Sequence, residues 1–318
     1  MRLKELRESY LAGRIEKKLY WEIARGNYTH ILTDLQSVVK DNPEIESVVI
    51  QKNGIVLTKA NGVKLYFDFS QSICRAEVDL LLEGDPEKED MVFINDYLSN
   101  IDSRGVIFDI GANVGIFSLD FWLKHNSLEY YLFEPIPMTY RGLINNALLN
   151  MGTIPDNYKT HNIGMSDKKG SFDFFVPASN EAASLVANED SFYRKRADEN
   201  GVYNGCDDIE RVECKVETVD GFIEENGIER VDFIKIDVEG NEKNVLKGAE
   251  ASLKKYKPLV YCELLRKHAK RFGYHPNEVI EYMSDMGYVC KTMRDGQLVL
   301  VKEITEDTIE TNFFFEKN

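Results

Sequence analysis

The sequence has little positive charge and no long apolar run. Lysine and arginine number 39 against 54 aspartate and glutamate, which gives a net charge of −15 and a pI of about 4.9. Such a chain repels nucleic acid and anionic lipid, so nucleic acid is not an expected partner. The charged N-terminus has no apolar core of a signal peptide, and no later run has the length of a transmembrane segment. Peripheral membrane contact stays open.

Cysteine is also scarce, and the five cysteines are scattered. They are Cys74, Cys206, Cys214, Cys262 and Cys290. No two of them have the spacing of a zinc site, and an odd count in a long chain favours reduced thiols. We therefore expect a cytoplasmic protein without structural disulfides.

The composition predicts one large domain with an N-terminal extension, because 318 residues with 43% hydrophobic side chains can bury a sizeable core. Residues 1–40 show apolar positions at helical spacing between charges, which makes these helices a candidate surface for homo-oligomer formation. Residues 46–69 read as three strands separated by Asn-Gly turns. We expect residues 1–100 to form helices plus a β-meander cap, 101–303 the main domain, and 304–318 a C-terminal tail.

Strands and helices alternate after residue 105, which predicts a doubly wound, mostly parallel α/β sheet with helices on both faces. The expected strands lie near 105–110, 129–134, 158–163, 231–237 and 258–264. The expected helices lie near 114–125, 138–150, 241–255 and 275–286. Two further strands surround Asp295-Gly296 as a closing antiparallel hairpin.

The alternation breaks between Phe172 and Thr218. The runs "FDFFV" and "RVECKVE" read as extended, and residues 177–210 between them are long and polar. Long loops without regular structure are usually functional, so this segment is expected to be an insertion that contacts the substrate. Its basic run, Tyr193–Arg196, is either a solvated loop or a contact for a phosphate or carboxylate of the substrate.

The stretch "VIFDIGANVGIF" contains the clearest ligand-binding pattern. A strand ends in glycines and enters a helix, a place where backbone N–H groups face a ligand. Dinucleotide sites have G-x-G-x-x-G there, and the chain lacks it. Asp109 before the loop would repel a pyrophosphate and suits the cationic S-adenosylmethionine. The next strand ends in Glu134, which can accept hydrogen bonds from ribose hydroxyls of either cofactor.

Several motifs resemble FkbM-type S-adenosylmethionine-dependent methyltransferases. They are "FDIGANVGIFSL", "FEPIP", "LINNALLN", "NIGMSDKKGSFDFFV", "VETVDGFI" and "VDFIKIDVEGNEKNVLKGAE", and they cover about residues 105–263. The resemblance implies a class I methyltransferase (Rossmann-like) fold with a seven-stranded sheet. It also implies methylation of a hydroxyl, most often on a sugar, a glycolipid or a polyketide-type natural product.

The same resemblance assigns the cofactor contacts. The glycine loop would line the methionine and ribose, Glu134 would hold the ribose, the end of the third strand would flank the adenine, and Asp237 would face the reactive methyl group. The residues concerned are Asp109, Gly111, Ala112, Asn113, Gly115, Glu134, Asn162, Gly164 and Asp237.

Acidic side chains at the mouth of the sheet are the candidate catalytic groups. Methyl transfer to an alcohol requires alignment of donor and acceptor and removal of a proton. Asp237, Glu239 and Glu263 are expected near the methyl group, and His268 is a further candidate base. Glu242 either joins them or stabilises a helix N-terminus. Clustered carboxylates can also bind Mg²⁺, but the sequence has no metal signature and no metal site is predicted.

Other functions stay open at this stage. One is an N- or carboxyl-methyltransferase of a peptide or small molecule, and another is a non-catalytic module that binds S-adenosylmethionine. An NAD-linked oxidoreductase is disfavoured by the missing glycine pattern. The favoured hypothesis is an O-methyltransferase with a small-molecule or glycan acceptor.

Overall fold

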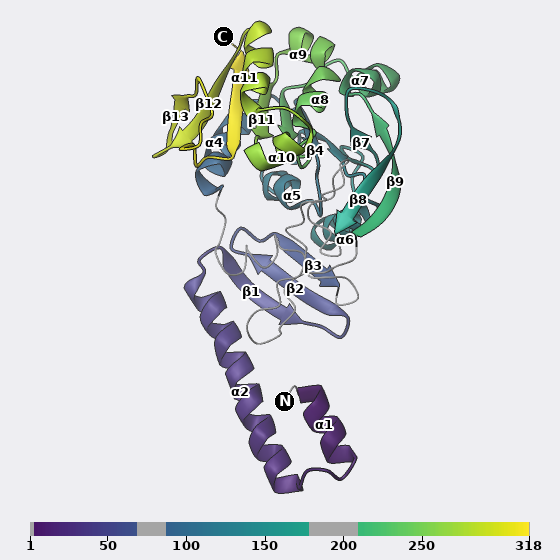
Figure 1. The fold of residues 1–318 in the computed structure, drawn as a ribbon, viewed down its shortest axis with the longest axis vertical. Coiled ribbons are helices and arrows are strands. Elements are labelled where there is room, and N and C mark those ends of the chain that lie inside the picture. Colours follow the sequence, from purple (N-terminus) through teal and green to yellow (C-terminus); the bar gives the residue numbers. More distant parts are fainter. Residues whose placement is uncertain (1–2, 69–86, 178–208, 318) are drawn as a thin grey trace.

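The computed structural model describes residues 3–68, 87–177 and 209–317 (Figure 1). The predicted substrate segment 177–210, with its basic run, therefore lies almost entirely outside the described residues. Figure 1 shows a helical pair at the N-terminus, a small sheet next to it, and a larger body of strands and helices. In the described part of the chain, no helix is both long and apolar enough to cross a membrane.

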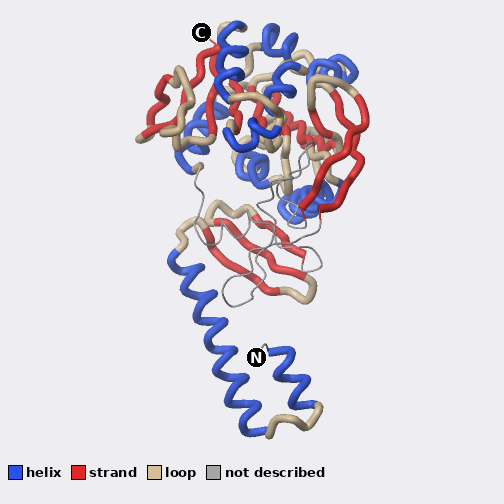
Figure 2. The backbone as a smooth tube through the Cα atoms, in the orientation of Figure 1, coloured by secondary structure: helices blue, strands red, loops and turns tan. Residues whose placement is uncertain are grey.

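The N-terminal part follows the prediction. Helices α1 (Leu3–Leu11) and α2 (Lys17–Asp41) pack side by side, and α2 projects from the body. Strands β1 (Ile45–Ile50), β2 (Gly54–Lys59) and β3 (Lys64–Asp68) form an antiparallel meander, visible as three neighbouring strands in Figure 2.

The meander is attached to the main body through polar side chains. Asn146 and Asn150, one turn apart on helix α6 (Pro137–Met151), accept hydrogen bonds from the backbone N–H groups of Tyr66 and Lys64. Asn150 also donates to the Lys64 carbonyl. The helix therefore supplies a partner for the open edge of β3. These side chains fix the small sheet to the wall of the main domain.

An eight-stranded sheet forms the centre of the main body, in the order β13-β12-β14-β11-β10-β4-β5-β6. The five strands from β11 to β6 are parallel to one another, and the other three are antiparallel to their neighbours. The parallel strands are β4 (Val106–Ile110), β5 (Glu129–Phe133), β6 (Tyr158–His161), β10 (Phe233–Ile236) and β11 (Leu259–Glu263). The others are β12 (Tyr288–Arg294), β13 (Gln297–Leu300) and β14 (Asn312–Lys317). This is the class I methyltransferase sheet, with β13 as an additional edge strand.

Helices cover both faces of this sheet, and each face has its own apolar core. The first core includes side chains from α7 (Val219–Asn226), α8 (Glu242–Lys247), α9 (Glu250–Tyr256), α10 (Arg266–Arg271) and α11 (Pro276–Asp285). The second core includes side chains from α4 (Lys88–Ser99), α5 (Ile116–Trp122), α6 and the meander. The predicted double winding is thus confirmed.

Two sequence predictions are wrong in detail. The single helix expected over 241–255 is two helices, because the chain bends at Gly248, where a Cβ atom would lie 2.1 Å from the Ser166 carbonyl oxygen. The expected tail 304–318 contains β14, which lies between β11 and β12 in the sheet. Phe313, Phe314 and Phe315 are fully buried there, so this part of the chain belongs to the main domain.

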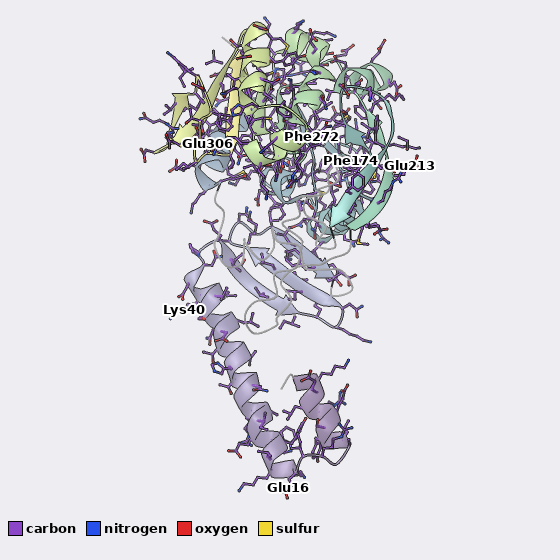
Figure 3. The ribbon with its side chains drawn as sticks, viewed as in Figure 1. Glu16, Lys40, Phe174, Glu213, Phe272 and Glu306 are labelled. Carbon is purple, nitrogen blue, oxygen red and sulfur yellow. The ribbon has the colours of Figure 1, made fainter. Side chains whose placement is uncertain are left out.

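A third, small sheet lies beside the parallel strands. Strands β7 (Gly164–Met165), β9 (Ile209–Glu217) and β8 (Gly170–Pro177) form it in that order, with β8 and β9 antiparallel. The extended conformation predicted for "FDFFV" and "RVECKVE" is confirmed. Phe174 of β8, labelled in Figure 3, is buried against a small apolar cluster of this sheet.

Candidate functional site

The glycine loop connects β4 to α5 at the carboxyl edge of the sheet. Gly111, Asn113 and Gly115 have φ angles of +79°, +51° and +86°, a region that favours glycine and tolerates asparagine. A Cβ atom on Gly111 would lie only 1.7 Å from the carbonyl oxygen of Asp237. Glycine is therefore required where the loop passes the end of β10.

Asp109 supports this loop from below. Its side chain is fully buried, and its Oδ2 accepts a hydrogen bond from the Ser118 hydroxyl at 2.6 Å. Burial raises the pKa of Asp109, opposed by the charge of Lys235 and by the Ser118 hydrogen bond. The predicted cofactor residue Asp109 thus lies beneath the loop, where it shapes the site without lining it.

Lys235 is a buried ammonium between the glycine loop and the end of β10. Its Nζ donates to the Gly111 carbonyl at 2.9 Å and lies 3.2 Å from Asp237 Oδ2 and 3.6 Å from Asp109 Oδ1. Burial alone would lower the pKa of Lys235, but the Asp237 and Asp109 carboxylates outweigh it and raise the pKa above its ordinary value. Lys235 therefore stays charged and holds these three groups together.

Glu134 ends β5 beside the loop and is also buried. Its two carboxylate oxygens accept hydrogen bonds from the backbone N–H groups of Asn113 at 3.0 Å and Ile136 at 2.9 Å. Burial raises the pKa of Glu134 to about 7 despite these bonds. Asn162 donates to the carbonyls of Glu134 and Pro135, so its amide group positions the Glu134 segment.

These elements surround an open pocket of about 660 Å³, a volume that includes the solvent at its mouth. The lining residues are Gly111, Asn113, Phe133, Glu134, Pro135, Thr139, Gly164, Met165, Phe174, Asp237, Val238, Glu239 and Asn241. The structure thus brings together five of the predicted cofactor residues. Asp109, Ala112, Gly115 and Asn162 are not part of the lining.

Two lining residues contain polar atoms that suit a bound ligand. Asn113 Oδ1 and Thr139 Oγ1 are buried and have no hydrogen-bond partner in the described structure. A buried polar atom without a partner is costly, and a ligand hydroxyl or amine would satisfy it. Together with the close backbone approach at Gly111, they fit the polar and cationic groups of S-adenosylmethionine.

Two of the four candidate catalytic side chains, Asp237 and Glu239, line this pocket, whereas His268 and Glu263 lie next to Glu239 and outside the lining. Asp237 is 40% exposed, whereas Glu239, Glu263 and His268 are largely buried. His268 Nδ1 lies 3.0 Å from Glu239 Oε2 and 3.9 Å from Glu263 Oε2. Burial raises the pKa of Glu263, and the negative charges of Asp237 and Glu239 raise it further. In the described residues, no group of three or more acidic, His or Cys side chains is arranged to hold a metal ion.

Sequence reasoning did not single out Lys235, Thr139 and Asn241. A signal existed for Lys235, because a charged residue inside the apolar strand "FIKI" must have a buried partner. Asn241 donates to the Met165 carbonyl at 3.1 Å and ties α8 to β7. Nothing in the local sequence marks that contact, since Met165 is 76 residues away.

An open pocket at the carboxyl ends of β4, β5 and β10, with the acidic Glu134 directly after β5 and no phosphate-binding glycine pattern, is the arrangement of a class I S-adenosylmethionine-dependent methyltransferase domain. The FkbM methyltransferase domain profile matches residues 109–290, so this chain belongs to the FkbM methyltransferase family.

Curated relatives agree with this assignment. Methyltransferase sdnD of Sordaria araneosa is 29% identical over 167 residues, 48% of this chain and 63% of that protein. The 31-O-demethyl-FK506 methyltransferase FkbM of Streptomyces tacrolimicus is 29% identical over 160 residues, 46% of this chain and 59% of that protein. The hexuronic acid methyltransferase AglP of Haloferax volcanii is 26% identical over 208 residues, 64% of this chain and 72% of that protein.

A crystal structure of an FkbM methyltransferase from Methylobacillus flagellatus is similar in fold, with 14% identity and a TM-score of 0.40. The matched region covers 76% of this chain and 52% of that chain. The chain spans about three fifths of the length of sdnD and FkbM.

Proposed function

We propose that this protein is an S-adenosylmethionine-dependent O-methyltransferase that acts on a hydroxyl group of a sugar, glycan or glycosylated natural product. The observation that carries the proposal is the pocket in which Gly111, Glu134 and Asp237 meet. Each ends or follows a different parallel strand, at the edge where such sheets bind ligands.

The arrangement of polar and apolar groups in the pocket suggests one orientation for the bound cofactor. The Glu134 carboxylate would accept hydrogen bonds from the ribose hydroxyls. The free side of Asp237 and the glycine loop would hold the methionine part, whose ammonium group suits a carboxylate. Gly164, Met165 and Phe174 supply the apolar walls expected around the adenine. When bound, S-adenosylmethionine supplies a methyl carbon already activated by the sulfonium.

A hydroxyl acceptor is favoured by the groups at the far end of the pocket. An alcohol must lose a proton during transfer. Asp237 and Glu239 in the pocket lining are candidate bases, together with His268 and Glu263 next to Glu239. The name of the relative FkbM specifies a 31-O-demethyl substrate, and the name of AglP specifies a hexuronic acid, which is a sugar derivative. Clustered carboxylates are also good acceptors for the several hydroxyls of a sugar.

The experiment is transfer of a labelled methyl group from S-adenosylmethionine to a panel of acceptors. The panel contains methyl glycosides of neutral sugars, methyl glucuronide, simple amines and short peptides. We expect label on a sugar hydroxyl that survives mild alkali, as an ether does. Alkali-labile label would indicate a carboxyl ester, and label on an amine would indicate N-methylation. Binding of S-adenosylhomocysteine without transfer across a broad panel would favour a non-catalytic module.

A further inference from the structure

The loop after β10 has an unusual backbone conformation. Glu239 has φ +57° and Gly240 has φ +111°, and a positive φ at a non-glycine residue is uncommon and often marks a functional site. A Cβ atom on Gly240 would lie 2.7 Å from the Phe272 ring and 2.8 Å from the carbonyl oxygen of His268. Figure 3 labels Phe272 next to α10. The loop therefore packs directly on the helix that carries His268.

Glu242 holds the loop in this conformation. Its Oε1 accepts hydrogen bonds from the backbone N–H groups of Gly240 at 2.8 Å and Val238 at 3.3 Å, and its Oε2 accepts one from the Tyr274 hydroxyl at 2.9 Å. Both carboxylate oxygens of Glu242 are thus committed to structure. Glu239, between the two anchored N–H groups, lines the pocket and lies beside His268.

The His268 ring is positioned by carboxylates on one side. Its Nδ1 is fully buried and lies 3.0 Å from Glu239 Oε2, without hydrogen-bond geometry in this structure. Catalytic hydrogen bonds are commonly long or poorly aligned before substrate binds. The side chain is 14% exposed, and because Nδ1 is buried, the exposed atoms lie elsewhere on the ring.

Asp237 is less suited to accept the proton. Its Oδ2 lies 3.2 Å from the charged Nζ of Lys235, so this oxygen already belongs to an ion pair at the end of β10.

We propose, on the basis of the proposed function, that His268 is the general base and that Glu239 and Glu263 are positioning residues that hold its ring. A carboxylate beside Nδ1 keeps the proton on Nδ1 and leaves Nε2 as the acceptor. The acceptor oxygen then forms a bond to the methyl carbon while the carbon–sulfur bond breaks and its electron pair goes to sulfur. The hydroxyl proton passes to Nε2, and the imidazolium is stabilised by the carboxylates.

The tautomer of the His268 ring tests this assignment of the base, and its measurement does not require the methyl-acceptor substrate. The chain has five histidines, so long-range proton–nitrogen spectra of the full chain with S-adenosylhomocysteine are simple, and His268→Gln identifies the His268 signals. At a pH where these signals no longer change, we expect the proton on Nδ1 in the wild type. Glu239→Ala should shift the population toward the form with the proton on Nε2. A wild-type ring protonated on Nε2 would overturn the proposal.

Turnover gives a second, independent measurement. With the hydroxyl acceptor found in the panel, His268→Gln should lower kcat about 10²–10⁴-fold, with S-adenosylhomocysteine affinity within about twofold. His30→Gln, an exposed residue of α2, is the matched control and should turn over normally. If the wild type does not bind S-adenosylhomocysteine, the proposed function fails. If it binds and His268→Gln turns over at the wild-type rate, only the assignment of the base is wrong.

Discussion

The ammonium group of Lys235 lies 3.2 Å from Asp237 Oδ2 and at the same time donates to the Gly111 carbonyl at 2.9 Å. One buried side chain thereby joins the ends of the two central strands, β4 and β10, that contact the cofactor pocket. Asp109 also lies fully buried next to this charge, with its Oδ1 3.6 Å from Lys235 Nζ.

Lys235→Met should therefore strongly destabilise the protein. Removing one partner of a buried ion pair leaves an uncompensated charge and typically costs about 3–5 kcal/mol. Lys159→Met is the control, since Lys159 pairs with Glu129 near the surface and such pairs contribute about 1 kcal/mol or less. Urea denaturation of both variants checks the difference. Equal midpoints would mean that Lys235 does not stabilise the loop.

Gly111→Ala should disrupt the structure far more than the same substitution at another glycine with positive φ. A Cβ atom at Gly111 meets the Asp237 carbonyl oxygen, whereas at Gly152, with φ +74°, it meets nothing within 4 Å. Gly152→Ala should cost about 1–2 kcal/mol from backbone strain alone. Gly111→Ala should cost clearly more and abolish S-adenosylhomocysteine binding. Denaturant unfolding measures the loss of stability, and calorimetry measures S-adenosylhomocysteine binding. Similar results for the two variants would contradict the close approach of Gly111 to the Asp237 carbonyl oxygen.

Glu134→Gln should weaken cofactor binding by about ten- to a hundredfold, because hydrogen bonds to a charged group contribute about 1.5–3 kcal/mol and those to a neutral group less. Glu129→Gln lies at the other end of β5 and should leave affinity unchanged. Calorimetry with S-adenosylhomocysteine measures both. An unaltered affinity in a folded Glu134→Gln protein would place the ribose elsewhere.

The buried carboxyl groups also predict a pH dependence. Burial raises the pKa of Glu134 and of Glu242 from 4.5 to about 7. The folded chain then binds more protons than the unfolded chain between these values, so these two groups make stability fall as pH rises from about 4.5 to 7.

Ribose hydroxyls that donate to Glu134 favour its charged form and lower its pKa. Cofactor binding should therefore release protons at pH values below about 7, and affinity should increase as the pH rises toward 7, the raised pKa of Glu134. Calorimetry in buffers of different ionisation enthalpy measures the released protons. Glu134→Gln should remove this release, and a release that persists in the variant would assign it to another group.

Phe315→Ala should destabilise the domain by about 3–5 kcal/mol, the usual cost of removing a buried phenylalanine side chain. Phe315 is fully buried in β14, whereas Ile309, six residues earlier, is 87% exposed. Ile309→Ala is therefore the control and should change stability by less than about 0.5 kcal/mol. Denaturant unfolding measures both variants, and equal midpoints would contradict the placement of β14 in the core of the sheet.

The parallel strands and the cofactor loop were predictable because their signals are local. Apolar runs such as "VIFDI" and "FIKI" mark the strands, and Gly111 and Glu134 directly follow the ends of two neighbouring strands. The pocket confirms that these residues meet.

The remaining features depend on distant contacts. "NFFFEK" follows a polar stretch at the end of the chain, and only its pairing with β11 and β12 makes it a central strand. Gly248, between α8 and α9, packs closely on the Ser166 carbonyl oxygen, 82 residues earlier, and the grouping of Glu239 with His268 depends on how the loop packs on α10. Such contacts are properties of the folded chain and leave no periodic pattern in the sequence.

The most direct test of the central claim is calorimetry of the wild-type chain with S-adenosylhomocysteine and, separately, with NAD. The pocket of Gly111, Glu134 and Asp237 predicts one site for S-adenosylhomocysteine per chain, lost in Gly111→Ala and weakened in Glu134→Gln, with no heat from NAD. Tight binding of NAD together with no response to S-adenosylhomocysteine would contradict the account.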